Sequence, residues 1–300
     1  FAAAVFVVLH IGAHKSELPW LLNQTGPLPA CHPKDGDSIQ AGRIYVAPPD
    51  HHLVVEPGHM RLTRGPRENW ARPAVDPLFR SAARAYGPSA IGVILTGGLN
   101  DGTAGLYEIK QHGGTTVVQD PGDAVNPSMP RSALEHVVVD HCLPLAAISV
   151  LLAGLVAGRS SALVTSATTW RGGMTAEYKL DDPVAVTCPD CGGALLRTEL
   201  GTLTQFRCHI GHIYTAEVMI AAQFAALEWD LEAAMRALSE RGELCRQMVE
   251  KARSAGDDGM AAQWEAAMHE AKERTGVLRE LLGREWIHPG DIEPLAPSDG

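Results

Sequence analysis

The stretch from Ile91 to Gly105 constrains the fold of this chain more than any other, because it joins a short apolar run to a glycine-rich turn. The apolar run is too short for a helix and is β-branched at three positions, which is typical of a buried parallel strand. Gly97 and Gly98 end this strand, and the following residues predict a turn and then a helix over Thr103–Gln111. Strand, turn and helix form the βα unit of an open α/β sheet, in which ligands bind beyond the carboxyl ends of the strands. Asp101 is therefore expected where such a sheet carries its chemistry.

A second apolar run, Val5–Ile11, predicts another buried strand that places His14 just beyond its carboxyl end. Taken singly, Asp101 is explained as a turn or helix-capping aspartate and His14 as a structural histidine. Two such residues at equivalent strand ends instead favour a catalytic pair. In such a pair the histidine accepts a proton from a hydroxyl, and the carboxylate orients the ring.

The partners that such a pair needs are only partly visible in the sequence. The backbone N–H groups at Gly97 and Gly98 are candidates to face an oxyanion. A hydroxyl nucleophile is harder to find, because the chain contains no Gly-x-Ser-x-Gly turn. Ser16 is better explained as a helix N-cap, and Ser128 lies in a polar loop with no predicted partner.

Apolar runs alternate with helical patterns up to about Ala157, which predicts an α/β class with a doubly wound, mostly parallel sheet. We expect a catalytic domain over 1–157, a linker rich in Ser, Thr, Gly and Asp over 158–186, a zinc ribbon over 187–214, and a helical hairpin and tail over 215–300. Within the first domain, Val137–Val139 is predicted as a short strand. His51 and His52 are predicted as loop residues before a β-hairpin.

Cysteine spacing predicts a metal site in the second half of the chain. Cys188 and Cys191 form a Cys-x-x-Cys knuckle, and Cys208 opens a second knuckle that contains two histidines. Zinc takes four such ligands in a tetrahedron, and a site closed by four protein ligands is structural. His212 is preferred over His209 as the fourth ligand, because side chains of adjacent residues diverge. A thioredoxin-like redox pair is the alternative, but it leaves the second knuckle unexplained.

Charge and composition exclude several classes of function. The net charge of −10 argues against nonspecific nucleic-acid binding. No apolar run is long enough for a membrane span, so membrane insertion is not expected. Six cysteines with a single Cys-x-x-Cys fit a reducing, cytoplasmic location better than a disulfide framework. The acidic residues of the hairpin are interpreted as a solvated helical face.

Residues 5–156 resemble the catalytic domain of the chemotaxis protein-glutamate methylesterase family, often called CheB-type. The resemblance rests on the order and spacing of five segments: 7–14 (VVLHIGAH), 42–48 (GRIYVAP), 72–79 (RPAVDPLF), 95–102 (LTGGLNDG) and 129–131 (MPR). In that family the residues matching His14 and Asp101 complete a serine triad. The family's serine lies in a Gly-x-Ser-x-Gly-Gly turn upstream of the strand matched here, so the chain is expected to be truncated before its nucleophile.

The resemblance implies an enzyme that hydrolyses glutamate γ-methyl esters on receptors or other signalling proteins through an acyl-enzyme, with glutamine deamidation as a related activity. It implies no cofactor for catalysis, and the ribbon and hairpin resemble an extension of some stand-alone members. The family often has Met where this chain has Gly98, which keeps the amide and loses the side chain. The alternative is a catalytically silent scaffold that recruits a partner through the zinc ribbon and the acidic hairpin.

Overall fold

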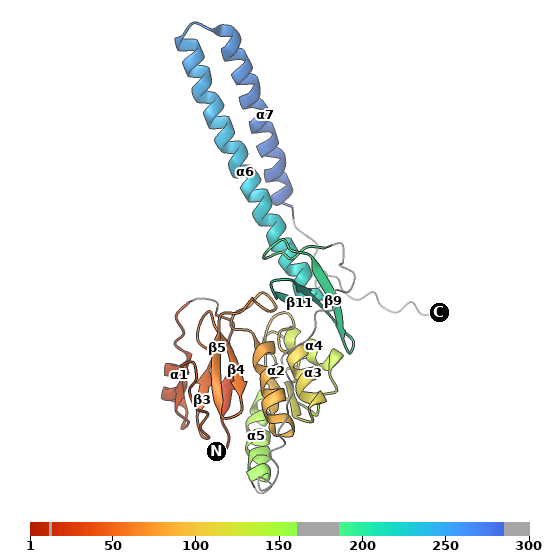
Figure 1. The fold of residues 1–300 in the computed structure, drawn as a ribbon. Helices are drawn as coiled ribbons and strands as arrows, with labels where there is room; N and C mark the ends of the chain where they lie inside the picture. The colour runs from red at the N-terminus through yellow and green to blue at the C-terminus, as the bar shows by residue number, and fades with distance from the viewer. Residues whose placement is uncertain (12–13, 161–185, 285–300) are drawn as a thin grey trace, which may run out of the picture. The chain divides into compact units, whose positions relative to one another are not determined.

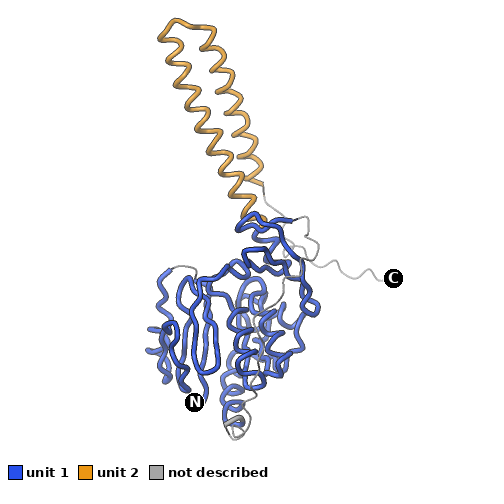
Figure 2. Tube along the Cα trace, in the orientation of Figure 1, with its two compact units in different colours: residues 1–222 blue, residues 223–300 orange. Residues whose placement is uncertain are grey.

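A computed structural model describes residues 1–11, 14–160 and 186–284. The chain divides into two compact units, residues 1–222 and 223–300 (Figure 2). The first unit therefore contains the α/β part together with the cysteine-rich segment. The predicted linker over 158–186 lies almost entirely outside the described residues.

The amino-terminal part of the first unit holds a small parallel sheet and a β-hairpin (Figure 1). The sheet has the order β1-β3-β2, with β1 at Val5–Val7, β2 at Ala30–Cys31 and β3 at Ile44–Val46. Helix α1, Leu18–Thr25, lies between β1 and β2 in the chain. The hairpin of β4, His52–Glu56, and β5, His59–Thr63, is antiparallel, as its alternating pattern predicts.

The second part alternates helices and parallel strands, as predicted. Its sheet has the order β6-β7-β8, with parallel pairing throughout. The elements in chain order are α2 (Val75–Tyr86), the short 3-10 helix η1 (Gly87–Ser89), β6 (Ile91–Ile94), α3 (Thr103–Gln111), β7 (Thr115–Gln119), α4 (Ser128–His136), β8 (His141–Leu143) and α5 (Leu145–Ser160). The described strands thus form two parallel three-stranded sheets, whereas the sequence analysis expected one.

Apolar packing joins these two parts. Val8 and Phe79 pack against the core around β6 and β7 and also against the core around the hairpin. Helices α2 and α3 approach closely because Gly105 has no side chain: a Cβ there would lie 2.5 Å from Phe79 Cβ. This close approach brings the start of α2 against the turn that carries Asp101.

The cysteine-rich segment is an antiparallel sheet of order β9-β10-β11, formed by Leu195–Leu200, Leu203–Cys208 and Ile213–Thr215. Its own core contains the buried Leu195, Tyr214 and Val218. A parallel bridge between Glu68 and Ile213 attaches this sheet to the α/β part. We call residues 187–215 the ribbon.

Two long helices follow, as the sequence predicts: α6, Ala216–Ser254, and α7, Asp258–Leu282. Gly256 adopts a φ of 71°, a left-handed conformation that ends α6 without steric cost. The Asp257 side chain accepts a hydrogen bond from the Met260 N–H at 2.9 Å and caps α7. Within the described part of the chain, no helix has the length and apolarity that crossing a bilayer requires.

Four local predictions were wrong. Ser128, predicted to lie in a polar loop, is the first residue of helix α4. Helix α1 begins at Leu18 after Glu17, so Ser16 is not its N-cap. The residues 137–139 are not a strand, and the third strand of that sheet is β8. His52 belongs to β4 and is buried, not part of a loop. Each error concerns an element boundary, which depends on packing with distant segments as well as on local sequence.

Candidate active site

Asp101 is paired with a histidine, but this is His10 and not the predicted His14. The His10 Nε2 and Asp101 Oδ2 atoms are 2.7 Å apart. His14 is exposed, four residues farther along the chain. The correction follows from the length of β1, which pairs with β3 only over Val5–Val7. His10 is therefore the first histidine after the end of the strand. The sequence signal for this boundary was that the β-branched residues stop at Val8.

The carboxylate of Asp101 is buried and receives hydrogen bonds on both oxygens. Oδ2 accepts from the Val75 N–H at 2.6 Å as well as from His10. Oδ1 accepts from Asn69 Nδ2 at 3.0 Å and from the Asp76 N–H at 3.3 Å. Because donors surround it, the carboxylate is held in one orientation and in its ionised form.

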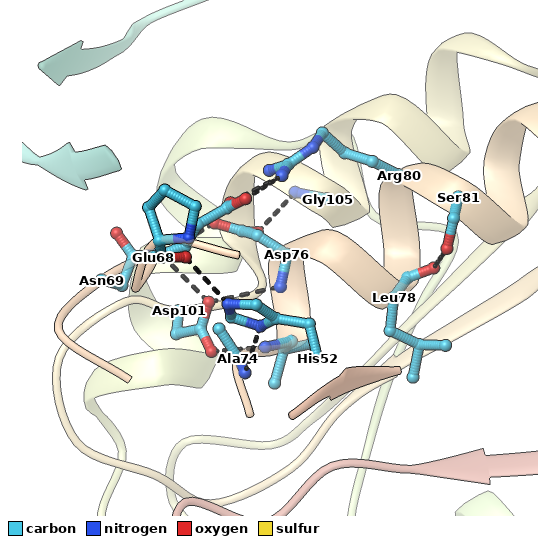
Figure 3. A network of polar contacts seen from close by, with 12 residues as sticks. His52, Glu68, Asn69, Ala74, Asp76, Leu78, Arg80, Ser81, Asp101 and Gly105 are labelled. Carbon is cyan, nitrogen blue, oxygen red and sulfur yellow. Dashed lines mark hydrogen bonds and ion pairs between the residues drawn. The ribbon is translucent and has the colours of Figure 1, made fainter. Parts of the chain in front are cut away.

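A second buried carboxylate, Asp76, lies beside the first (Figure 3). Asn69 Nδ2 donates to Asp76 Oδ2 at 2.8 Å, so one amide group serves both carboxylates. Asp76 Oδ1 accepts from the Gly105 N–H at 2.7 Å. Burial and the neighbouring charge of Asp101 raise the pKa of Asp76 to about 7. Sequence reasoning missed both Asn69 and Asp76.

The pKa values of the pair are set by opposing effects. Burial raises the pKa of Asp101, but the hydrogen bonds and positive charge of His10 and the donors Val75 and Asn69 outweigh it, so this pKa lies below its usual value. Burial lowers the pKa of His10, but the hydrogen bond and charge of Asp101 and the charge of Asp76 raise it above 6.5. The His10 side chain is 37% exposed. The ring is thus an accessible base whose protonated form the carboxylate stabilises.

A second histidine near the pair, His52, is held neutral. Its Nε2–H donates to the Pro66 carbonyl oxygen at 3.0 Å, and its Nδ1 accepts from the Ala74 N–H at 3.3 Å. Burial lowers its pKa. With both ring nitrogens engaged, His52 supports the start of α2 and is not a candidate base.

The glycine loop after β6 differs in part from the prediction. The Gly97 N–H donates to the Asn126 carbonyl oxygen at 3.0 Å, so it is not available to an oxyanion. In the described residues no acceptor receives the Gly98 N–H, which leaves Gly98 as the candidate donor. Leu99 adopts a φ of 58°, a left-handed conformation that is unusual for a branched side chain and is concentrated at functional loops.

We expect Gly97→Ala to destabilise the fold by about 1–3 kcal/mol, the usual cost of overpacking. A Cβ at Gly97 would lie 2.1 Å from Met129 Sδ, so the methionine or the loop must move. Gly98→Ala is the matched control, because its Cβ would meet only Asn126 Nδ2 at 3.4 Å. Urea unfolding of both variants measures the difference. Equal stability of the two variants would contradict the packing described for this loop.

The ribbon brings together the four predicted metal ligands. The ligand atoms of Cys188, Cys191, Cys208 and His212 lie within 4.8 Å of one another. His212 Nδ1 is 3.4 Å from Cys208 Sγ and 3.5 Å from Cys188 Sγ, and the Sγ atoms of Cys191 and Cys208 are 3.7 Å apart. A zinc tetrahedron with Zn–S of about 2.3 Å and Zn–N of about 2.0–2.1 Å has S–S edges of about 3.8 Å and S–N edges of about 3.5–3.6 Å, so these distances fit this metal.

His209 lies outside this cluster. Its ring lies against Gly193, where a Cβ would approach His209 Nδ1 to 2.4 Å. His212, in contrast, places Nδ1 in the cluster and Nε2 3.9 Å from Asp190 Oδ2. The same Asp190 oxygen accepts a hydrogen bond from the Tyr214 hydroxyl at 2.6 Å.

Comparisons with known proteins place the α/β part in a family. Residues 1–152 match the family model described as CheB methylesterase. A putative protein-glutamate methylesterase/protein-glutamine glutaminase of Leptospira interrogans is 40% identical over 154 residues, which cover 50% of this chain and 79% of that protein. Protein-glutamate methylesterase/protein-glutamine glutaminase 2 of Anaeromyxobacter dehalogenans is 41% identical over 146 residues, which cover 48% of this chain and 43% of that protein.

Among solved structures, the catalytic domain of Thermotoga maritima CheB methylesterase is 33% identical, with a TM-score of 0.49, and the match covers 52% of this chain and 84% of that one. The ribbon and the two long helices follow the residues matched by the family model. The matched residues include His10 and Asp101. The chain belongs to the CheB methylesterase family.

Proposed function

We propose that this chain carries the catalytic part of a protein-glutamate methylesterase, which hydrolyses glutamate γ-methyl esters on methylated receptors or other signalling proteins. The observation that carries the proposal is the 2.7 Å contact between His10 and the buried Asp101, within residues that match the methylesterase family. Relatives are named for this activity and for protein-glutamine glutaminase activity, which we propose as the related reaction on glutamine side chains.

His10 acts as the base through Nδ1, because its Nε2–H is engaged by Asp101. Nδ1 accepts the proton of a serine hydroxyl while the serine oxygen attacks the ester carbonyl carbon. The tetrahedral intermediate collapses to an acyl-enzyme, and the departing methoxide takes the proton from His10 and leaves as methanol. Water then repeats the sequence and releases the glutamate carboxylate. We propose that the Gly98 N–H donates to the oxyanion.

The serine is the group that the described residues do not supply to His10. We propose that it lies in a Gly-x-Ser-x-Gly-Gly turn after a strand next to β1, as the family resemblance implies. Two features support this position. Among the described strands, β1 pairs on one edge with β3 and β6 pairs on one edge with β7, which leaves one edge of each strand unpaired. His10 and Asp101, which follow these two strands, are in contact. A parallel strand that ended at this point would bring its turn to His10.

We propose that the ribbon binds one structural zinc ion through Cys188, Cys191, Cys208 and His212. Four protein ligands leave no open position, so the metal stabilises the fold and takes no part in ester hydrolysis. All six cysteines of the chain are unpaired thiols, which supports a reducing location such as the cytoplasm.

We expect Asp101→Asn to lower methylesterase turnover by about 10⁴-fold, because an amide no longer fixes the tautomer of His10 or stabilises its protonated form. The assay is methanol release from a methylated receptor, with a chain that begins at the start of its coding sequence. The catalytically silent scaffold is the alternative function. No methanol release from the wild-type chain would favour it, and undiminished release by Asp101→Asn would refute the role given to the pair.

A further inference from the structure

We propose that the ribbon holds the catalytic aspartate in place, and that Asn69 and Thr215 are the positioning residues through which it does so. The inference rests on the proposed function in taking Asp101 as the catalytic carboxylate and the ribbon as a zinc site. Its basis is a continuous chain of hydrogen bonds between β11 and the two buried carboxylates. All of the residues involved belong to the same compact unit.

Asn69 connects the ribbon to Asp101 through its backbone and both ends of its side chain. Its backbone N–H donates to the Ile213 carbonyl oxygen at 2.7 Å, and its Oδ1 accepts from the Thr215 N–H at 3.2 Å. Its Nδ2 donates to Asp101 Oδ1 and Asp76 Oδ2. Hydrogen bonds to β11 therefore fix the orientation of the Asn69 side-chain amide, and in this orientation Nδ2 donates to both carboxylates.

A second connection reaches the residue before Asp101. The Thr215 hydroxyl donates to Asn100 Oδ1 at 2.6 Å, and Asn100 Nδ2 donates to Glu217 Oε2 at 2.6 Å. Thr215 is fully buried, and Asn100 is 2% exposed, so neither bond is easily replaced by water. Both connections thus end on the turn that carries the catalytic carboxylate.

The metal ligands determine where Thr215 lies. Cys208 is the last residue of β10, and His212 immediately precedes β11. The Cys208 N–H donates to the His212 carbonyl oxygen at 3.1 Å, which closes the turn between the two strands. Four ligands on one metal would fix this turn and with it the register of β11. Loss of such a metal would release the turn, and Asn69 would then lose the Ile213 acceptor of its backbone N–H and the Thr215 N–H that holds its side-chain Oδ1.

The effect on the carboxylates follows from their burial. Asp76 and Asp101 share the Asn69 donor, and burial with mutual repulsion already raises the pKa of Asp76 to about 7. If the Asn69 amide is free to rotate, it no longer donates steadily to both carboxylates, so their negative charges are less well compensated. Asp101 is then held less firmly against His10 and the Val75 N–H. Local opening at Val75 and loss of the His10 hydrogen bond are the expected signs.

The test uses nuclear magnetic resonance of the chain loaded with zinc and compares Thr215→Val with Thr215→Ser. Thr215→Val keeps the shape of the side chain but removes the hydroxyl that donates to Asn100 Oδ1. We expect the Val75 amide to exchange its hydrogen about tenfold faster, within the range of energetic coupling between sites, and the deshielded ring N–H resonance of His10 to broaden. Thr215→Ser should restore both signals. Thr204→Val is the matched control in the same ribbon, because the Thr204 hydroxyl donates only to Glu199 in the described residues.

Metal removal provides the second measurement, which remains decisive if Thr215→Val does not fold. A chelator should accelerate Val75 exchange in the wild-type chain and have a smaller effect in Asn69→Ala, because the variant has already lost the side-chain connection from β11 to Asp101 and keeps only the one through Asn100. Equal chelator effects in the two proteins, or a Val75 amide that is insensitive to both zinc and Thr215→Val, would overturn the proposal. These signals do not depend on turnover. Failure of the methanol assay would leave them unchanged, and their absence in an active enzyme would refute the positioning role alone.

Discussion

His10→Gln is expected to lower methylesterase turnover on the order of 10⁶-fold, the size of the loss when the histidine of a serine-protease triad is removed. Glutamine can still donate a hydrogen bond to Asp101 but cannot accept the serine proton. The side chain is 37% exposed, so its replacement leaves no core cavity and the fold should persist. Methanol release by a chain that begins at the start of its coding sequence measures the loss, and circular dichroism verifies the fold.

His14→Gln is the matched control for this variant. His14 is exposed, and it is not among the described residues that donate hydrogen bonds to Asp101 or Asp76. We expect it to retain turnover within about twofold, as for a surface substitution away from the site. If His14→Gln were inactive and His10→Gln active, the catalytic pair would be the one predicted from the sequence and not the one in the structure.

The second large effect is expected from the metal ligands. Cys208→Ser should abolish stoichiometric zinc binding and unfold the ribbon, because the metal contributes about 10–16 kcal/mol of apparent binding free energy in small structural zinc sites. Zinc analysis should find about one ion per wild-type chain and none in the variant. Hydrogen exchange should show protection lost from β9 to β11, while the buried Val117 and Val118 of β7 stay protected by their own core.

Cys142→Ser controls for the loss of a thiol, because Cys142 is exposed and lies outside the four-ligand cluster. It should bind zinc and keep the ribbon protected. A wild-type chain that binds no zinc, and in which Cys188 and Cys191 form a reversible disulfide, would support the redox pair in place of the structural metal.

The sequence predicts best where several local signals agree. The β-branched run, the paired glycines and the Asn-Asp-Gly turn place β6, the Asp101 turn and α3 correctly, and α3 has the predicted bounds of Thr103–Gln111. The metal cluster could also be predicted from local sequence. Within each knuckle, the Cys-x-x-Cys spacing or the spacer from Cys208 to His212 already brings the side chains together. The choice of His212 over His209 agrees with the cluster in the structure.

The rest depends on contacts that no local pattern records. The end of β1 is fixed by pairing with β3, which itself stops at Val46 before two prolines that cannot donate hydrogen bonds. This non-local limit decides between His10 and His14. Asn69 is likewise invisible in the sequence, because it meets Asp101 and Thr215 across 32 and 146 positions of the chain. Its φ of 49°, tolerated by asparagine, aims the amide at both.

The most direct test of the account is the pH titration of the His10 ring, followed by nuclear magnetic resonance in the chain as printed and in Asp101→Asn. The wild-type pKa should lie above 6.5, because Asp101 and Asp76 outweigh the effect of burial. Since catalysis needs the neutral ring, activity should rise with pH through this raised value. Removing the Asp101 charge should lower the pKa of His10, because burial then meets less opposition. A wild-type pKa at or below 6.5 that does not change in Asp101→Asn would contradict the pairing on which the proposed mechanism rests.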